Sequence, residues 1–95
     1  MKLTVSQIEL NQRQIPDWKL NAKGEIEKMF VFKGFPQAVL FVNAVALLAE
    51  GKNHHPDILI QWNRVTLALS THDVEGLSEL DFELAKQINT LPVLT

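Results

Sequence analysis

The sequence has 95 residues, a formal net charge of −2 at pH 7 and no cysteine. A chain this short has room for one hydrophobic core, and no long polar linker divides it, so we expect a single domain over residues 1–95. The charge argues against a protein whose main task is to hold phosphate backbones, and the lack of cysteine excludes a disulfide scaffold, a thiolate nucleophile and Cys-ligated zinc. Residues 1–7 never reach the apolar stretch of a secretory signal, so we expect a cytoplasmic protein that binds neither nucleic acid nor membrane.

The first third of the chain predicts a short helix and a β-hairpin. Thr4 followed by Gln7 and Ser6 followed by Glu9 both have the spacing of a capping box, so we expect a short helix to begin here and to end before Pro16. Residues 18–20 are then typical of a strand and residues 21–24 of a turn. Residues 26–33 alternate like a second strand. One face of this strand would carry Ile26, Lys28, Phe30 and Phe32, and the other Met29 and Val31.

A long apolar helix is predicted over residues 36–50. Pro36 suits the first helical position, and Gly51 suits the C′ position just after the end. Only Asn43 is polar between residues 38 and 49, so such a helix must be covered on more than one side, although it is too short to cross a bilayer. We expect one side to lie on the sheet through Ala38, Phe41, Val42, Val45 and Leu48. We expect the other side to form an oligomer interface through Val39, Leu40, Ala46 and Leu47.

The remaining residues predict a second hairpin and a last helix. Residues 58–62 and 65–71 alternate, with residues 63–64 as the tight connection between them. Ser78 is expected to cap a helix that stops before Pro92. Its apolar stripe would be Leu80, Leu84, Ile88 and Leu91. The order helix, two strands, helix, two strands, helix predicts an α+β fold, a four-stranded antiparallel sheet with the three helices packed on one face.

Three histidines, His54, His55 and His72, are the residues best suited to carry chemistry. An unperturbed imidazole has a pKa of about 6.5, so it can both give and take a proton near neutral pH. Pro56 biases His55 toward extended backbone, in which neighbouring side chains point to opposite sides. His72 ends the strand predicted to pair with residues 58–62, which returns it to the sheet end where the other two enter. The hairpin therefore predicts that the three imidazoles are neighbours.

The same residues allow other interpretations on spacing alone. A His-His pair is often a feature of a surface loop, and three histidines with Glu50 or Asp81 would be enough for a catalytic zinc ion, although no His-x-x-x-His or His-x-His spacing preorganises such a site. Asp81 also stands three residues after Ser78, where it would close a capping box, and this role is compatible with a place in the site. Trp62 alternates with core positions, which favours a place in the core.

Taken together, these residues closely resemble the signature of the pterin-4a-carbinolamine dehydratase family. The spacing runs from Glu50 over three residues to His54-His55-Pro56, over five to Trp62, over nine to His72 and over eight to Asp81. The likeness extends to Trp18-Lys19-Leu20, to Phe30-x-Phe32-x-x-Phe35-x-x-Ala38 and to Thr71-His72-Asp73 with Gly76-Leu77-Ser78. It therefore covers most of the chain.

The resemblance implies the α+β fold described above, assembled as a homodimer or homotetramer through the helix at 36–50 or a sheet edge. It implies dehydration of 4a-hydroxytetrahydropterin to quinonoid dihydropterin, which recycles the pterin cofactor of aromatic amino acid hydroxylases, with no metal and with the pterin as substrate. It assigns His54 and His72 to acid and base transfer, and His55 to holding the pterin and stabilising charge. It also implies substrate binding by the other signature residues, namely Glu50, Pro56, Trp62 and Asp81. As an alternative, two of them, Glu50 and Asp81, would orient the imidazoles.

Two positions depart from the family pattern. Ile58 stands where some members carry an aromatic residue, which would remove one stacking wall for the pterin, and Glu75 stands where a glycine is common. The alternative function is that of a non-catalytic interaction protein, because animal relatives in the family also act as dimerisation coactivators of a homeodomain transcription factor. The helix at 36–50 would then carry the function, and the histidines would be idle.

Overall fold

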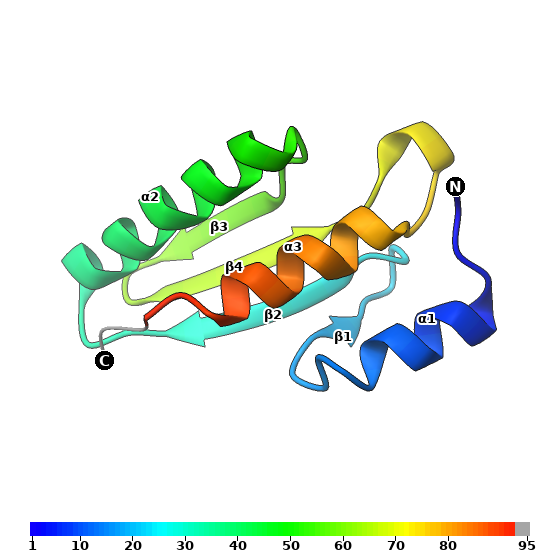
Figure 1. Cartoon of the computed structure of the whole chain (residues 1–95). Helices are drawn as coiled ribbons and strands as arrows, with labels where there is room; N and C mark the ends of the chain where they lie inside the picture. The colour runs from blue at the N-terminus through cyan, green and yellow to red at the C-terminus, as the bar shows by residue number, and fades with distance from the viewer. Residues whose placement is uncertain (93–95) are drawn as a thin grey trace.

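The computed structural model describes residues 1–92, which form one four-stranded antiparallel sheet with helices packed against it (Figure 1). The elements are α1 (Val5–Gln12), β1 (Lys19–Leu20), β2 (Ile26–Val31), α2 (Phe35–Lys52), β3 (Asp57–Gln61), β4 (Arg64–Leu69), the 3₁₀ turn η1 (His72–Val74) and α3 (Glu79–Asn89). The strands lie in the order β1-β2-β4-β3. α2 and α3 lie side by side over one face, and α1 lies next to β1 at the sheet margin. The predicted α+β order of helices and strands is confirmed.

Local signals set the ends of the first two helices. Thr4 Oγ1 accepts a hydrogen bond from the Gln7 N–H at 3.2 Å, and the Gln7 side chain accepts one from the Thr4 N–H at 2.9 Å. Of the two predicted capping boxes, the one at Thr4 is therefore present, and Ser6 lies inside the helix. α2 runs past Gly51 and ends at Asn53, which takes left-handed backbone with φ of 50°. The prediction that Gly51 follows the helix end is therefore wrong, because asparagine also tolerates left-handed backbone at a helix terminus.

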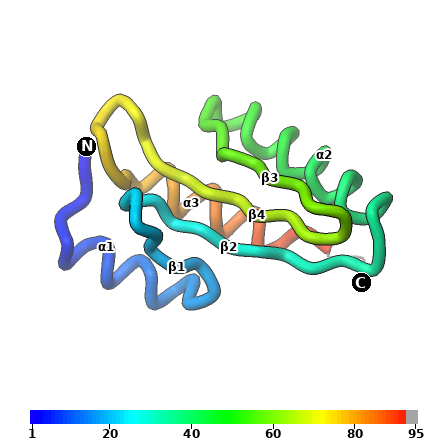
Figure 2. Tube along the Cα trace, turned by 180° about the vertical axis from the view of Figure 1, so that it is seen from behind, coloured from blue at the N-terminus to red at the C-terminus, as the bar shows by residue number. Residues whose placement is uncertain are grey.

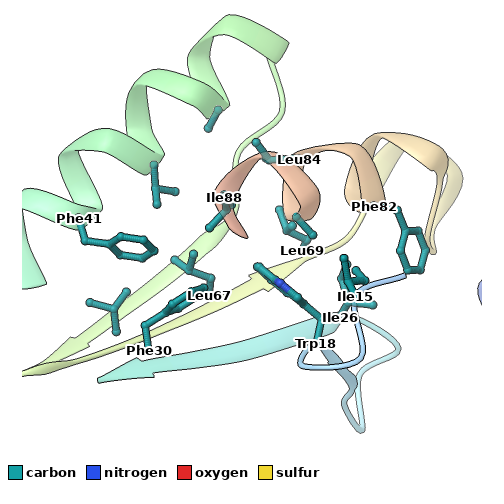
Figure 3. Close-up of a cluster of buried hydrophobic side chains, with 14 of the residues drawn as sticks. Ile15, Trp18, Ile26, Phe30, Phe41, Leu67, Leu69, Phe82, Leu84 and Ile88 are labelled. Atoms are coloured by element: carbon teal, nitrogen blue, oxygen red, sulfur yellow. The ribbon is translucent and has the colours of Figure 1, made fainter. Parts of the chain in front are cut away.

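The core lies between the inner face of the sheet and the two helices α2 and α3 (Figure 3). The Phe30 ring centroid lies 4.6 Å from that of Phe41 on α2 and 6.1 Å from that of Trp18. Lys28 shares this face and places its ammonium 4.5 Å from the centre of the Phe30 ring. The inward face predicted for β2 is thus confirmed. The α2 residues predicted to meet the sheet are also buried or half-buried, namely Ala38, Phe41, Val42, Val45 and Leu48.

The hairpin of β3 and β4 turns one residue earlier than predicted. Gln61 pairs with Arg64, so the two turn residues are Trp62 and Asn63. Asn63 stabilises the turn, because its side-chain amide donates to the carbonyl of Phe32 at 3.0 Å. Trp62 takes positive φ at the hairpin tip, and 70% of its surface is exposed. The prediction that Trp62 belongs to the core is therefore wrong.

The last helix is capped as predicted, but its buried face differs from the expected stripe. Ser78 and Asp81 form the capping box of α3. Leu80 is 40% exposed, which contradicts its place in the stripe. The buried side chains of α3 are Asp81, Phe82, Leu84, Ala85 and Ile88. The helix therefore buries a carboxylate at its first turn, and this residue belongs to the site described below.

Two apolar surfaces of the described chain have no cover. All five residues of the edge strand β3 are exposed, and so are Leu40 and Leu47 on the outward side of α2. Figure 2 shows the face of the sheet opposite α2 and α3, where no helix of residues 1–92 crosses β2, β4 or β3. None of the helices in this part of the chain has the length and apolar composition needed to span a bilayer.

Candidate active site

A depression at one end of the sheet gathers the three histidines. It has a volume of about 380 Å³, and His54, His55 and His72 all line it. The first two precede β3 and the third follows β4, and antiparallel pairing of these strands brings both segments to the same end. The prediction that the three imidazoles are neighbours is confirmed. A larger hollow of about 550 Å³ beside the N-terminus has no histidine in its lining, so the chemistry points to the smaller one.

The end of α2 places His54. Left-handed backbone at Asn53 lets the His54 N–H donate to the carbonyl of Ala49 at 3.0 Å, while the Asn53 N–H donates to that of Glu50 at 3.1 Å. This pair of bonds is a Schellman motif, which turns the chain away from the helix axis. His54 is only 9% exposed as a result, and its Nε2 meets Asp81 of α3.

Asp81 is fully buried, and its carboxylate is completely paired. Oδ1 lies 2.5 Å from His54 Nε2. Oδ2 accepts hydrogen bonds from the hydroxyl of Thr71 at 2.8 Å and from the N–H of Ser78 at 2.9 Å. Burial of a carboxylate is tolerated only when such partners replace water. Asp81 therefore closes the capping box of α3 and holds an imidazole at the same time, so the two roles foreseen for it coexist.

His55 and Glu50 form a second pair at the mouth of the depression. His55 Nε2 lies 2.9 Å from Glu50 Oε1, and the two side chains are 60% and 79% exposed. Water screens a pair this open, so it orients the His55 imidazole more weakly than Asp81 orients that of His54. The placement of Glu50 in the last turns of α2 is thereby explained, since its carboxylate faces an imidazole.

A tight loop after β4 presents His72. The Thr71 N–H donates to the carbonyl of Gly76 at 2.8 Å, which closes the loop, and His72 begins η1 directly after Thr71. Glu75 completes the loop in left-handed backbone with φ of 53°, and its N–H donates to the carbonyl of His72 at 3.1 Å. β4 itself ends at Leu69, so His72 opens a 3₁₀ turn instead of ending the strand. Its side chain is exposed at the rim.

The structure separates the remaining predicted site residues. Pro56 lines the depression between His55 and β3. Trp62 lies at the far end of β3, roughly 20 Å from Pro56 at about 3.3 Å per strand residue. Ile58 in β3 is 38% exposed. Within one chain, therefore, Trp62 does not reach the imidazoles.

Sequence reasoning missed two residues that support the site, Thr71 and Ser78. Their hydroxyls lie 2.7 Å apart and are buried behind Asp81. The sequence does indicate both positions, because Thr71 directly precedes His72 and Ser78 caps α3. What the sequence did not reveal is the closed loop between them, in which the Thr71 N–H bonds to the carbonyl of Gly76 and which makes these two residues neighbours. Over residues 1–92, no group of three or more His, Asp or Glu side chains is placed to hold a metal ion.

Comparison with known sequences points to one family. Residues 1–91 match the sequence profile described as pterin 4 alpha carbinolamine dehydratase. A relative from Chloroflexus aggregans, provisionally named after this dehydratase, is 47% identical and covers 95% of this chain and 96% of its own length. One from Acidobacterium capsulatum, also provisionally named, is 51% identical and covers 95% and 97%.

Solved structures share the fold. A crystal structure of a transcriptional coactivator/pterin dehydratase from Brucella melitensis matches with a TM-score of 0.88 at 34% identity, over 94% of this chain and 96% of that one. A pterin dehydratase-like protein, identified as a RuBisCO assembly factor in the alpha-carboxysome, matches with a TM-score of 0.68 at 23% identity, over 83% and 93%. The second likeness concerns the fold alone.

Proposed function

Because the chain belongs to the pterin-4a-carbinolamine dehydratase family, we propose that it removes water from 4a-hydroxytetrahydropterin to give quinonoid dihydropterin. The observation that carries the proposal is a single depression lined by three imidazoles, one of which is held by a buried carboxylate. Its volume of about 380 Å³ lies within the range of small-molecule sites, roughly 300–1,000 Å³. The proposal includes recycling of the pterin cofactor of aromatic amino acid hydroxylases, in the cytoplasm.

The reaction needs both an acid and a base. The bond between C4a and its hydroxyl oxygen breaks, and the oxygen leaves as water after an acid protonates it. A base removes the N–H proton of the neighbouring ring nitrogen as the C=N bond forms. His54 and His72 arrive from different segments, the end of α2 and the end of β4, so they can serve different atoms of one bound ring. Neutral and protonated imidazoles suit these two tasks near neutral pH.

The rim of the depression would hold the rest of the pterin. We assign His55, held by Glu50, to binding the pterin and stabilising charge that develops on it. Pro56 would form part of the wall. Asp57 and Asp73 also line the depression, and their carboxylates can accept hydrogen bonds from the N–H groups on the pterin edge. Asp81 acts through His54, because both of its oxygens are already engaged.

A direct assay of 4a-carbinolamine decay with purified protein tests this function. His54→Ala or His72→Ala is expected to lower kcat by about 10²–10⁴-fold, since each removes one proton-transfer group. Circular dichroism should show that both variants fold. Gln61→Ala, an exposed change at the far end of β3, is the control and should leave kcat unchanged. A fully active double variant would refute the assignment, and activity lost on removal of metal would favour the zinc alternative.

We also propose that the chain works as a homo-oligomer, a dimer or a tetramer. Two observations support this, the apolar outward side of α2 and the fully exposed edge strand β3. An open strand edge offers unpaired N–H and C=O groups to another strand, and an apolar helix face gains stability when a partner covers it. The similar protein from Brucella melitensis is described as a transcriptional coactivator as well as a dehydratase, so a binding role for α2 stays an alternative. A thermal shift with a pterin analogue that is lost in His54→Ala favours the enzyme.

A further inference from the structure

Behind His54 lies a chain of buried polar groups that ends on Asp81. Asp81 Oδ2 accepts from the Thr71 hydroxyl at 2.8 Å, and Asp81 Oδ1 lies 2.5 Å from His54 Nε2. The Thr71 and Ser78 oxygens lie 2.7 Å apart, and Ser78 Oγ accepts from the Leu80 N–H at 3.3 Å. His54, Thr71, Ser78 and Asp81 are the four buried polar or charged side chains of the described residues.

The direction of each hydrogen bond between these polar groups follows from counting protons. A threonine hydroxyl has one proton, and Thr71 gives its proton to the carboxylate. The bond between the two hydroxyls must therefore use the proton of Ser78, while the Ser78 oxygen accepts from the Leu80 N–H. All donors then point the same way, from Leu80 through Ser78 and Thr71 to Asp81. Hydrogen bonds aligned in this manner polarise and strengthen one another.

The Asp81 carboxylate determines which nitrogen of the His54 ring carries the proton. A carboxylate only accepts hydrogen bonds, so the proton on neutral His54 sits on Nε2 and the lone pair on Nδ1. Within residues 1–92, His54 Nδ1 makes no hydrogen bond, and no buried side-chain nitrogen or oxygen there lacks a partner. Nδ1 is therefore open to solvent, and His54 lines the depression. It is the nitrogen free to exchange a proton with a bound ligand.

We propose that Thr71 and Ser78 are positioning residues, which act through Asp81 to keep His54 in the Nε2–H tautomer with Nδ1 presented to the ligand. The effect of these residues on turnover rests on the proposed function. The tautomer of His54 is independent of that function, because it is a property of the free protein. Outer partners of this kind typically change activity by about 10–100-fold when removed, as they do behind metal-bound imidazoles.

The test combines NMR of the free protein with turnover. Long-range ¹H–¹⁵N spectra of the wild type, at a pH where His54 is neutral, should show the Nε2–H tautomer. Thr71→Val keeps the shape of the side chain and removes a donor that holds Asp81 Oδ2. The carboxylate can then turn away from His54 Nε2, so a mixture with the Nδ1–H tautomer is expected. Thr71→Ser returns the hydroxyl and should restore the wild-type spectrum. Thr66→Val, in the preceding strand β4, is the matched control and should change nothing.

Measuring kcat and KM of the same variants distinguishes a failure of the tautomer proposal from a failure of the proposed function. Thr71→Val is expected to lower kcat by about 10–100-fold with little change in KM, and Thr71→Ser to recover most of it. An Nδ1–H tautomer in the wild type overturns the inference even if Thr71→Val does not fold. An unchanged spectrum in folded Thr71→Val also overturns it. Full activity of His54→Ala would instead overturn the proposed function and leave the tautomer result standing.

Discussion

The three imidazoles of the site differ in how firmly neighbouring side chains hold them. His54 is buried and bonded to Asp81, whereas His55 is exposed and bonded to the still more exposed Glu50. His72 makes no side-chain hydrogen bond to any residue in the described range 1–92, and its side chain is exposed. A ligand would therefore find His54 already oriented and would have to order His72, which costs side-chain entropy on binding. The loop that carries His72 is closed by Glu75, a non-glycine residue in left-handed backbone.

Glu75→Gly should stabilise the protein. Left-handed backbone costs a residue with a Cβ about 1–2 kcal/mol, and glycine avoids this cost but loses roughly 0.5–1 kcal/mol through extra freedom in the unfolded chain. The net expectation is a gain of about 0.5 kcal/mol in the free energy of unfolding, measured by urea denaturation. Glu75→Ala keeps the Cβ and is the control, which should show no gain. If Glu75→Gly has a lower free energy of unfolding than the wild type, the Glu75 side chain itself supports the loop.

The first turn of α3 has two functions. Its capping box begins the helix and also places Asp81 against His54, so the same carboxylate supports the fold and the site. The end of α2 is similar, since the Schellman motif that stops the helix also aims His54 inward. Helix termini have unpaired backbone groups that local side chains must satisfy. In this protein those side chains and turns are the ones that build the site.

Asp81→Asn should lower both stability and activity. The amide has one acceptor oxygen and one donor nitrogen, so it cannot accept from Thr71, Ser78 and His54 together. A buried group left without its partner costs about 1–3 kcal/mol, and we expect the free energy of unfolding to fall by that amount in urea titrations. Glu79→Gln, an exposed change in the same turn, is the control and should stay within about 0.5 kcal/mol. Equal losses in the two variants would contradict a special role for Asp81.

Residues 1–92 leave apolar surface uncovered on α2 and along β3. Leu47 on α2 is 78% exposed, and Leu40 on the same helix is 57% exposed. The β3 edge carries Ile58, Leu59 and Ile60, each more than a third exposed. Patches of this kind on a small domain usually mark surfaces of association. The depression with the histidines lies at the end of the same strand, so assembly along β3 would place a second chain near the site.

Leu47→Glu should shift the protein to a smaller species. A charge placed in an apolar contact between copies must be desolvated, which disfavours association, whereas the exposed position leaves the fold of one chain unaffected. Light scattering with size-exclusion chromatography measures the mass, and circular dichroism checks the fold. Leu10→Glu on α1, where the leucine is 59% exposed, is the control and should keep the parent mass. A mass unchanged by Leu47→Glu would exclude this side of α2 as the interface.

Much of the architecture follows from short-range signals in the sequence. Capping boxes at Thr4 and Ser78 and the alternation in β2 are local patterns, and the structure confirms them. The clustering of His54, His55 and His72 was also predictable, because a hairpin returns its far end to its start. These features depend on residues only a few positions apart or on the pairing of adjacent strands.

The hairpin tip and the pairing of Asp81 depend on contacts between distant parts of the chain. The turn at Trp62 depends on the bond from Asn63 to Phe32, thirty-one residues away, and this one-residue shift exposes the indole at the hairpin tip. The partnership of Asp81 with His54 spans twenty-seven residues and requires α3 to pack beside the end of α2. Such contacts form because burial forces polar groups to find partners wherever packing brings them. Periodicity in the sequence contains no information on that choice.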